Sequence, residues 1–423
     1  MRVAVVGGGA AGLVTAWLLE HDHDVTLFEC DDRLGGHAHT IEIDVGGTKV
    51  SVDAGFQFFG PGPAYATFNR LLDELGVARR SYSATMTLHR AGRRSIALPP
   101  MRGGRPVWES LTPAALIDLI RFRRFLSDVP RFLARHDTTI TIDEYLARRR
   151  MPASFVDGFL YPLLLAFWCV DLQEFRHFAA YNALYYLGTS LSEGFRSPEQ
   201  SEIVGGMKTY VDAIVRDFDS TRVRVGSAVN GIERRDDGFS VDGEVFDQVV
   251  VATNARHARD LLTSVVGVEG LRAELERIEY FDTTIAIHGD PRLMPGSAGA
   301  WSVVNVRWDG THSHLSIFDP GRTVPVLRSW VTFDERMPAP LYAVSTYEHG
   351  KVTPAYFDAQ SALKGLHGRD GVWLAGLYMA DADSHESAVL SAVAVAERLA
   401  PEASRLHALR GRRAEPVNGF PGA

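Results

Sequence analysis

The feature that most constrains this chain is the turn Gly7-Gly8-Gly9-Ala10-Ala11-Gly12 near its start. An apolar, β-branched run at 2–6 precedes the turn, and apolar residues at helical spacing follow it over 13–19. A second apolar run at 25–28 then ends at Glu29. This order predicts a β-α-β unit that binds a dinucleotide, because it places a glycine turn between strand and helix and an acidic residue at the end of the second strand. A purely structural glycine turn is the alternative.

Each position in this unit has its own physical role. Gly7 allows the tight turn, Gly9 lets the main chain approach a pyrophosphate, and Gly12 lets helix and strand pack closely. The first helical residues, Ala10 and Ala11, present free N–H groups to the phosphates. Glu29 stands where an acidic side chain accepts hydrogen bonds from the ribose of the adenosine half.

The residues after the second strand indicate which dinucleotide is bound. They read Asp32-Arg33-Leu34-Gly35-Gly36-His37-Ala38-His39-Thr40. With this Arg-x-Gly-Gly turn the chain resembles the flavin-containing amine oxidase and phytoene desaturase superfamily, which implies FAD as the cofactor and places Arg33, Gly35, Gly36 and His37 beside it. The superfamily usually has an arginine where this chain has His37, and a neutral histidine lacks a constant positive charge. The alternative is that His37 and His39 are ordinary surface histidines.

The same resemblance implies further cofactor contacts. Gly55 and Phe56 follow an Asp-x-Gly segment that brings main chain against the flavin ring, and Gln57 adjoins them. Val229 corresponds to the residue that meets the adenine through its main chain, and Gly376 to a glycine at the pyrophosphate or ribityl chain. His385, Glu386 and Ala388 begin the last helix, whose first N–H groups meet the flavin pyrimidine in the superfamily. For each of the phenylalanines Phe56, Phe58 and Phe59, the alternative is a role as a core aromatic residue.

A stretch in the second half of the chain narrows the resemblance. The chain resembles a bacterial branch described as predicted NAD/FAD-binding or amine-oxidase-like proteins. The segments that carry this resemblance are 285–295, 300–305, 347–349 and 357–360. These proteins resemble the oxidase-like portion fused to, or encoded beside, cyclopropane fatty acid synthases, which implies a role in modified fatty acyl lipids. The branch usually has the sequence His-Glu-Asp-Gly at the start of the last helix, whereas this chain has His385-Glu386-Ser387-Ala388. The substrate class of the branch is therefore a weaker guide to the substrate of this chain.

The chain of 423 residues is expected to form two domains. The predicted fold is α/β: a Rossmann-like FAD-binding domain plus a substrate domain of mixed sheet and helices. The FAD-binding domain is expected to comprise residues 1–80, 201–275 and 345–400. The substrate domain is expected to comprise residues 81–200 and 276–344. Residues 401–423 are expected to form a mobile C-terminal tail.

Composition excludes several classes of protein. A net charge of -8 argues against nucleic acid as a partner, and two cysteines exclude a disulfide framework. No apolar run has the length of a membrane span and no targeting signal is evident. We therefore expect a cytoplasmic protein, and no residue pattern predicts a metal site.

The segment 155–186 is rich in large aromatic residues, more than packing alone requires, and we expect some of them to line an apolar substrate pocket. The candidate substrate-binding residues are Phe58, Phe159, Phe167, Trp168 and Tyr185. Thr112-Pro113 begins a helix with apolar residues on one side and Arg121, Arg123 and Arg124 on another. Such a helix is suited to an anionic membrane surface or an acyl carrier protein; a solvated face over a core is the alternative.

The chemistry predicted from these features is removal of a hydride. Superfamily amine oxidases use a lysine beside the flavin and two framing aromatics, but no lysine lies between Lys208 and Lys351, and Ser384 takes the place of one aromatic. We therefore predict an FAD-dependent oxidoreductase that takes hydride from an activated C–H of an apolar acyl or polyene substrate and forms a double bond. The alternatives are a redox-neutral double-bond isomerase, an amine oxidase, and a non-catalytic flavin-bound partner of a lipid-modifying enzyme. The candidate catalytic residues, chosen by position, are His385, Gln57 and His288.

Overall fold

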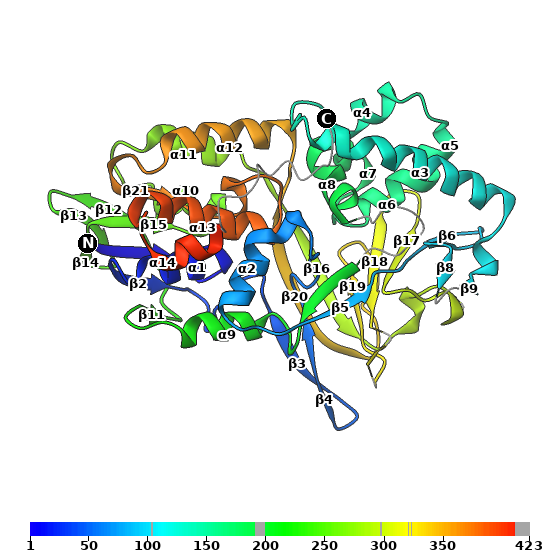
Figure 1. Cartoon of the computed structure of the whole chain (residues 1–423), viewed down its shortest axis with the longest axis horizontal. Helices are drawn as coiled ribbons and strands as arrows, with labels where there is room; N and C mark the ends of the chain where they lie inside the picture. Colours follow the sequence, from blue (N-terminus) through cyan, green and yellow to red (C-terminus); the bar gives the residue numbers. More distant parts are fainter. Residues whose placement is uncertain (103–104, 191–198, 297, 320, 323, 411–423) are drawn as a thin grey trace.

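Two large sheets organise the molecule and lie on opposite sides of the view in Figure 1. The structure is a computed structural model that describes residues 1–102, 105–190, 199–296, 298–319, 321–322 and 324–410. The first sheet is parallel throughout and has the order β11 (Arg222–Arg224), β2 (Asp24–Phe28), β1 (Arg2–Val6), β15 (Gln248–Val251) and β21 (Val372–Leu374). This is the predicted Rossmann-like sheet, and it begins with the predicted β-α-β unit.

Helices cover this sheet, so its central strands are apolar without alternation. The covering helices include α1 (Ala10–Leu19), α9 (Lys208–Arg216) and α13 (His385–Leu399). All ten residues of α1 are buried, as expected for a helix that is apolar on every side and packed between other elements. Residues 249–251 of β15 are fully buried for the same reason.

The second sheet is mixed, as predicted, and has seven strands. Its order is β20 (Leu341–Gly350), β16 (Tyr280–His288), β19 (Leu327–Trp330), β18 (Ser313–Phe318), β17 (Val304–Trp308), β6 (Met86–Arg90) and β7 (Ile96–Leu98). Only the β17–β6 pair among them is parallel. Figure 1 shows a group of helices above this sheet: α3 (Pro113–Leu133), α4 (Ile142–Arg148), α5 (Ala153–Phe155), α6 (Tyr161–Leu165), α7 (Leu172–Phe175) and α8 (Ala180–Ser190).

The smaller elements connect and flank these two layers. The small sheets pair β3 (Thr40–Val45) with β4 (Thr48–Asp53), β5 (Arg79–Ser83) with β10 (Glu199–Ile203), β8 (Met101–Arg102) with β9 (Arg105–Pro106), and β13 (Gly238–Val241) with both β12 (Ile232–Arg235) and β14 (Glu244–Phe246). The other α-helices are α2 (Ala66–Glu74), α10 (Ala255–Leu261), α11 (Glu269–Glu276), α12 (Pro354–Leu366) and α14 (Ser404–Arg410). Within the described residues, no helix combines the length and the apolar character needed to cross a membrane.

Local chemistry accounts for two of these elements. The β3–β4 hairpin turns at Gly46 and Gly47, whose φ angles of 60° and 85° are the pair that a two-residue hairpin turn requires. Helix α3 begins where predicted, because the Thr112 hydroxyl accepts a hydrogen bond from the N–H of Ala115 and Pro113 occupies the first helical position.

The predicted mobile tail is wrong over residues 401–410. Helix α14 buries Leu406 and Leu409 completely, and Arg405 donates to the Glu20 carboxylate at 2.6 Å while its guanidinium lies 4.7 Å from the centre of the Trp17 ring. Two leucines at helical spacing and one arginine are therefore enough to dock this segment. Residues 411–423 lie outside the described residues.

One domain boundary also differs from expectation. The boundary predicted between residues 344 and 345 falls inside strand β20, which spans Leu341–Gly350 without interruption. Strand β11 ends at Arg224, because Gly226 turns the chain with a φ of 61°. Strand β15 lies inside the parallel sheet, and β21 forms one of its edges.

Candidate active site

A cavity of about 1150 Å³ is lined by residues of both large sheets. Val6 and Phe28 reach it from the parallel sheet, and Ile285 and Trp330 from the seven-stranded sheet. One end therefore meets the predicted dinucleotide turn, and the other lies within the substrate half of the fold.

The glycine turn has the geometry that its spacing predicts. A Cβ on Gly12 would lie 1.8 Å from the main-chain oxygen of Gly7, so only glycine permits this packing of helix on strand. Gly7 itself has a φ of 110°, which favours glycine. A Cβ on Gly9 would meet no atom within 4 Å, although Gly9 lines the cavity. The space beside Gly9 and the start of α1 is thus open to a phosphate group.

Glu29 also lies where the sequence predicts. Its carboxylate accepts hydrogen bonds from the N–H of Gly8 at 2.6 Å and from the N–H of Asp31 at 2.8 Å. The side chain is buried and lines the cavity next to the strand end. Two main-chain donors therefore hold an acceptor in place at the position where a ribose is expected.

The turn after β2 places one permanent positive charge at the cavity. Burial and the nearby Arg33 lower the pKa of His37 to about 4, so its imidazole is neutral at pH 7. Arg33 lines the cavity too, and its guanidinium donates to the main-chain oxygen of Gly36 at 3.0 Å. Arg33 therefore supplies the cationic charge that His37 lacks.

Most of the predicted cofactor residues meet at this cavity. Those that line it are Gly7, Gly9, Ala10, Ala11, Glu29, Arg33, Gly35, Gly36, His37, Gly55, Phe56, Val229, Gly376, His385 and Ala388. They come from segments far apart in the chain, and together they fit a dinucleotide cofactor. Gly12 lies beneath the turn and shapes it without lining the cavity.

Glu386 does not belong to this set. Its two carboxylate oxygens accept hydrogen bonds from the N–H groups of Thr67 and Phe68, each at 2.7 Å. These donors lie in the first turn of α2, where main-chain N–H groups have no partner within the helix. The Glu386 carboxylate caps α2 and ties it to α13, so its cofactor contact stays a prediction that concerns the main chain.

The three candidate catalytic residues have different environments. His385 stacks on Phe56 with ring centres 4.3 Å apart, its Nε2 lies 3.0 Å from the Tyr210 hydroxyl, and burial lowers its pKa to about 3. Gln57 lines the cavity, and its amide donates to Glu202 at 3.4 Å. His288 does not line the cavity: it is fully buried, with Nε2 2.8 Å from the Ser329 hydroxyl. This placement does not favour a catalytic role for His288, which stays a prediction.

The predicted substrate aromatics divide in the same way. Phe58, Phe167 and Trp168 line the cavity, but Phe159 and Tyr185 do not. Phe159 packs in the core against two other rings, with its centre 5.3 Å from that of Phe122 and 5.4 Å from that of Phe155. Helix α3 and the seven-stranded sheet complete the apolar end of the cavity with Leu119, Phe122, Leu126, Val304, Leu315 and Ile317.

One arginine inside the cavity, Arg328, was not predicted from the sequence. Arg328 is 5% exposed, and its Nη1 donates to the main-chain oxygens of Asp53 at 2.7 Å and Gly55 at 3.1 Å. Its guanidinium lies 4.9 Å from the centre of the Trp330 ring, and within the described residues it has no ion pair with a carboxylate. Burial lowers the pKa of Arg328 to about 10, which leaves it charged at pH 7. No local signal distinguishes this arginine in a chain that contains many.

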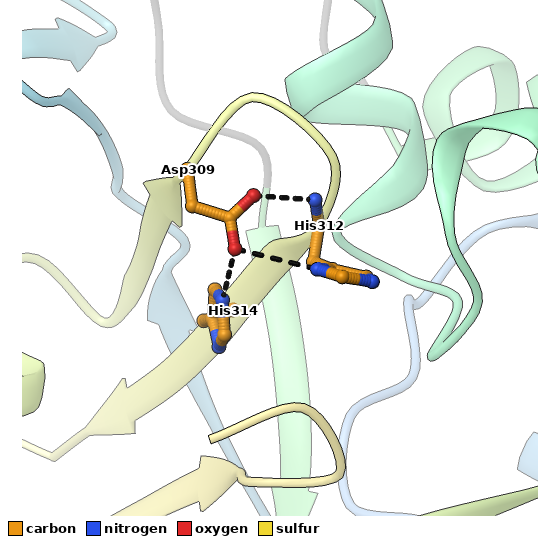
Figure 2. A group of neighbouring side chains, drawn as sticks. All are labelled: Asp309, His312 and His314. Carbon is orange, nitrogen blue, oxygen red and sulfur yellow. Dashed lines mark hydrogen bonds and ion pairs between the residues drawn. The ribbon is translucent and has the colours of Figure 1, made fainter. Parts of the chain in front are cut away.

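A second cluster of ionisable side chains lies away from the cavity, and Figure 2 shows its three members. Asp309 Oδ2 lies 3.3 Å from Nδ1 of His312 and 3.0 Å from Nε2 of His314. His314 Nδ1 lies 3.4 Å from the carboxylate of Asp334. The side chains hydrogen-bond one another across the turn between β17 and β18, so their arrangement is explained without a cation.

The comparisons with known proteins agree with this geometry. The family described as flavin containing amine oxidoreductase matches residues 10–339. The chain belongs to this family of flavin-dependent enzymes.

Individual relatives are more distant. The flavin-containing amine oxidase A of Canis lupus familiaris is 34% identical over 124 residues, which are 27% of this chain and 20% of that protein. Across the curated relatives compared, the match covers from 12% to 53% of the relative's length. A solved putrescine oxidase has a TM-score of 0.67 at 14% identity and covers 95% of this chain and 100% of its own. A fatty acid isomerase from P. acnes, described as CLA-producing, also has a TM-score of 0.67 at 14% identity. The match covers 94% of this chain and 98% of the isomerase. At these identities the two structures establish the fold alone.

Proposed function

We propose that this protein is an FAD-dependent oxidoreductase that removes hydride from an activated C–H of an apolar acyl substrate and so introduces a double bond. The observation that carries the proposal is the composition of the cavity. Beyond the dinucleotide end its wall is mainly apolar, formed by α3, Phe167, Trp168 and the seven-stranded sheet, with Arg123 and Arg328 as cations, and no lysine is among the described residues that line it. The resemblance to the branch associated with cyclopropane fatty acid synthases favours the same substrate class.

Arg328 favours an acyl over a polyene substrate. A buried guanidinium that lacks a carboxylate partner is costly, and an anionic group that enters the cavity relieves this cost. Arginine pairs with carboxylates through two parallel hydrogen bonds. A fatty acid carboxylate would supply this partner, whereas a hydrocarbon polyene would not.

The residues of the chain then have separate tasks. FAD, when bound, accepts the hydride. Gly9, Arg33 and the N–H groups at the start of α1 hold the pyrophosphate, and Glu29 holds the ribose. The apolar wall excludes water and orients the chain of the substrate beside the flavin. The aromatic rings of Phe58, Phe167 and Trp168 fix its position.

The test is the visible spectrum of the flavin-loaded protein, mixed without oxygen with unsaturated and branched acyl compounds, polyenes and amines. Bleaching by an acyl compound, with a product two hydrogens lighter in mass spectrometry, is the expected result. Bleaching by amines alone overturns the proposal and identifies an amine oxidase.

A second candidate is redox-neutral isomerisation, in which the hydride returns to another carbon of the same substrate. The similarity of fold to the fatty acid isomerase of P. acnes favours this variant. A product of unchanged mass with a steadily oxidised flavin would identify it. Membership in an enzyme family counts against the alternative of a non-catalytic flavin-bound partner.

We also propose a membrane surface as the partner of helix α3. Leu116, Ile117 and Ile120 are 44%, 49% and 62% exposed on one side of the helix. Arg123 lies on the same helix and lines the cavity, as do three apolar residues of α3. Apolar side chains beside Arg121 and Arg124 suit an anionic lipid surface, from which an acyl chain would reach the cavity directly. An acyl carrier protein is the alternative source of substrate.

A further inference from the structure

The segment before helix α13 places two carboxyl groups, Asp381 and Asp383, in opposite environments. Asp381 accepts hydrogen bonds from the Tyr181 hydroxyl at 2.8 Å and from Nε2 of His136 at 3.1 Å, and it does not line the cavity. Although burial raises the pKa of Asp381, these partners lower it overall. Its negative charge is therefore fully satisfied within the fold.

Asp383 lines the cavity and is 7% exposed. Its main chain is fixed on both sides: its N–H donates to Oδ1 of Asn182 at 3.0 Å, and its carbonyl oxygen accepts a hydrogen bond from the Tyr186 hydroxyl. Within the described residues its carboxyl group makes no hydrogen bond and no ion pair. The structure thus holds an unpartnered carboxyl group rigidly at the cavity wall.

The ionisable groups whose pKa the charge of Asp383 affects are four phenols. The charge of Asp383 contributes to the raised pKa of Tyr65, Tyr186, Tyr280 and Tyr356, which come from four different elements. Burial is the larger cause for each of them, so they stay neutral at pH 7. Burial alone raises the pKa of Asp383 to about 7, since no cation opposes it. A carboxyl group with this property exchanges protons readily near neutral pH.

We propose that Asp383 is the base of this site and accepts the proton from the carbon next to the one that loses the hydride. The inference rests on the proposed function, because formation of a double bond breaks two C–H bonds. One leaves with its electron pair as a hydride, which reduces the flavin. The electron pair of the other becomes the π bond, and its proton passes to the Asp383 carboxylate and later to solvent. Isomerisation by return of the hydride needs no such base.

The test compares the flavin-loaded wild type with Asp383→Asn and with the matched control Asp381→Asn. The first measurement, without substrate, follows the absorption of the bound flavin from pH 5 to pH 9. We expect one ionisation near pH 7 in the wild type and in Asp381→Asn, and its loss in Asp383→Asn. The same ionisation in Asp383→Asn overturns the inference.

The second measurement is the rate of anaerobic flavin bleaching by a fatty acid with one double bond, in which the allylic carbon that loses the hydride has a saturated neighbour that can lose the proton. We expect the wild-type rate to rise with pH through the same ionisation, and Asp383→Asn to be about 100-fold slower or more, in the range for a general base. Its affinity for the fatty acid should stay within about threefold, and Asp381→Asn should keep the wild-type rate and pH profile. Asp383→Glu, which keeps the carboxyl group, should retain the pH dependence at a reduced rate.

The outcomes separate the two hypotheses. Bleaching by the fatty acid at equal rates in wild type and Asp383→Asn overturns the inference and leaves the proposed function intact. Failure of every acyl compound to bleach the wild type overturns the proposed function and, with it, the role of Asp383 as the base in dehydrogenation.

Discussion

Arg328 on strand β19 and Gly55 beside strand β4 are joined by a hydrogen bond of 3.1 Å from the guanidinium to the main-chain oxygen. Through this bond the substrate half of the fold supports the segment that is predicted to face the flavin ring. The same guanidinium is the buried cation of the cavity. One residue therefore positions the cofactor side and presents a charge to the substrate side.

Replacement of Arg328 by Met should abolish the preference for acids over esters. A charge-assisted hydrogen bond contributes about 1.5–3 kcal/mol, so the wild type should bind a fatty acid at least about tenfold more tightly than its methyl ester. Spectral titration of the flavin measures both affinities. Arg322→Met is the control, because Arg322 donates to the main-chain oxygen of Ser51 in the same hairpin but does not line the cavity. Equal affinities for acid and ester in the wild type would contradict this assignment.

Two glycines of the turn should respond differently to alanine. Gly9→Ala should fold normally but bind flavin about 100-fold more weakly, because its Cβ occupies open space beside the predicted phosphate. Gly12→Ala should lose about 1–3 kcal/mol of unfolding free energy or fail to fold, since its Cβ meets the Gly7 oxygen. Flavin content and urea unfolding measure the two effects. Gly365→Ala in helix α12, where a Cβ meets no atom within 4 Å, is the control.

Glu386→Gln should reduce stability without reducing flavin affinity. The amide accepts only one of the two hydrogen bonds from the start of α2, so we expect a loss of about 1–3 kcal/mol in the free energy of unfolding. The exposed Glu397→Gln should cost less than about 1 kcal/mol. A large loss of flavin affinity at unchanged stability would identify the Glu386 carboxylate as a cofactor ligand.

The docked α14 should contribute stability that depends on pH. Arg405→Met leaves the fully buried side chain of Glu20 without its cation, which should cost about 3–5 kcal/mol at pH 7. Burial opposes ionisation of Glu20, but its hydrogen bonds, that from Arg405 the strongest, lower its pKa below the ordinary value of 4.5. Its stabilisation is therefore present above pH 4.5 and is lost as the pH falls through the folded-state pKa. Urea unfolding of both proteins at pH 7 and below pH 4 should show the difference shrinking; an unchanged difference would argue against the ion pair.

The exposed face of α3 should bind anionic lipid. The wild type should float with vesicles that contain phosphatidylglycerol, and more salt should weaken this association. The double variant Ile117→Ser/Ile120→Ser should float far less. Val266→Ser, at a position 73% exposed on another part of the molecule, should behave like the wild type. If the wild type does not float at low salt, α3 is not a membrane contact.

The sequence alone determined the dinucleotide half of the site. In the β-α-β unit the contacts that matter lie within about thirty residues, so spacing specifies geometry, as Gly7, Gly12 and Glu29 illustrate. Residues brought to the cavity from a distance, such as Val229 and Gly376, were predicted only through the resemblance to a family. Helix α14 was missed, because a short amphipathic pattern at the end of a chain does not specify the surface that it docks on.

The tertiary structure decided which side chains face the cavity. Glu386 and Asp383 lie three residues apart, yet one caps α2 and the other meets the cavity without a partner. His288 and Arg328 lie on neighbouring, paired strands, yet only Arg328 lines the cavity. The burial and orientation of these side chains, and the charges near them, depend on elements that are distant in sequence. The local sequence pattern therefore does not predict them. Burial raises the pKa of Asp383 to about 7, and only the folded chain produces that burial.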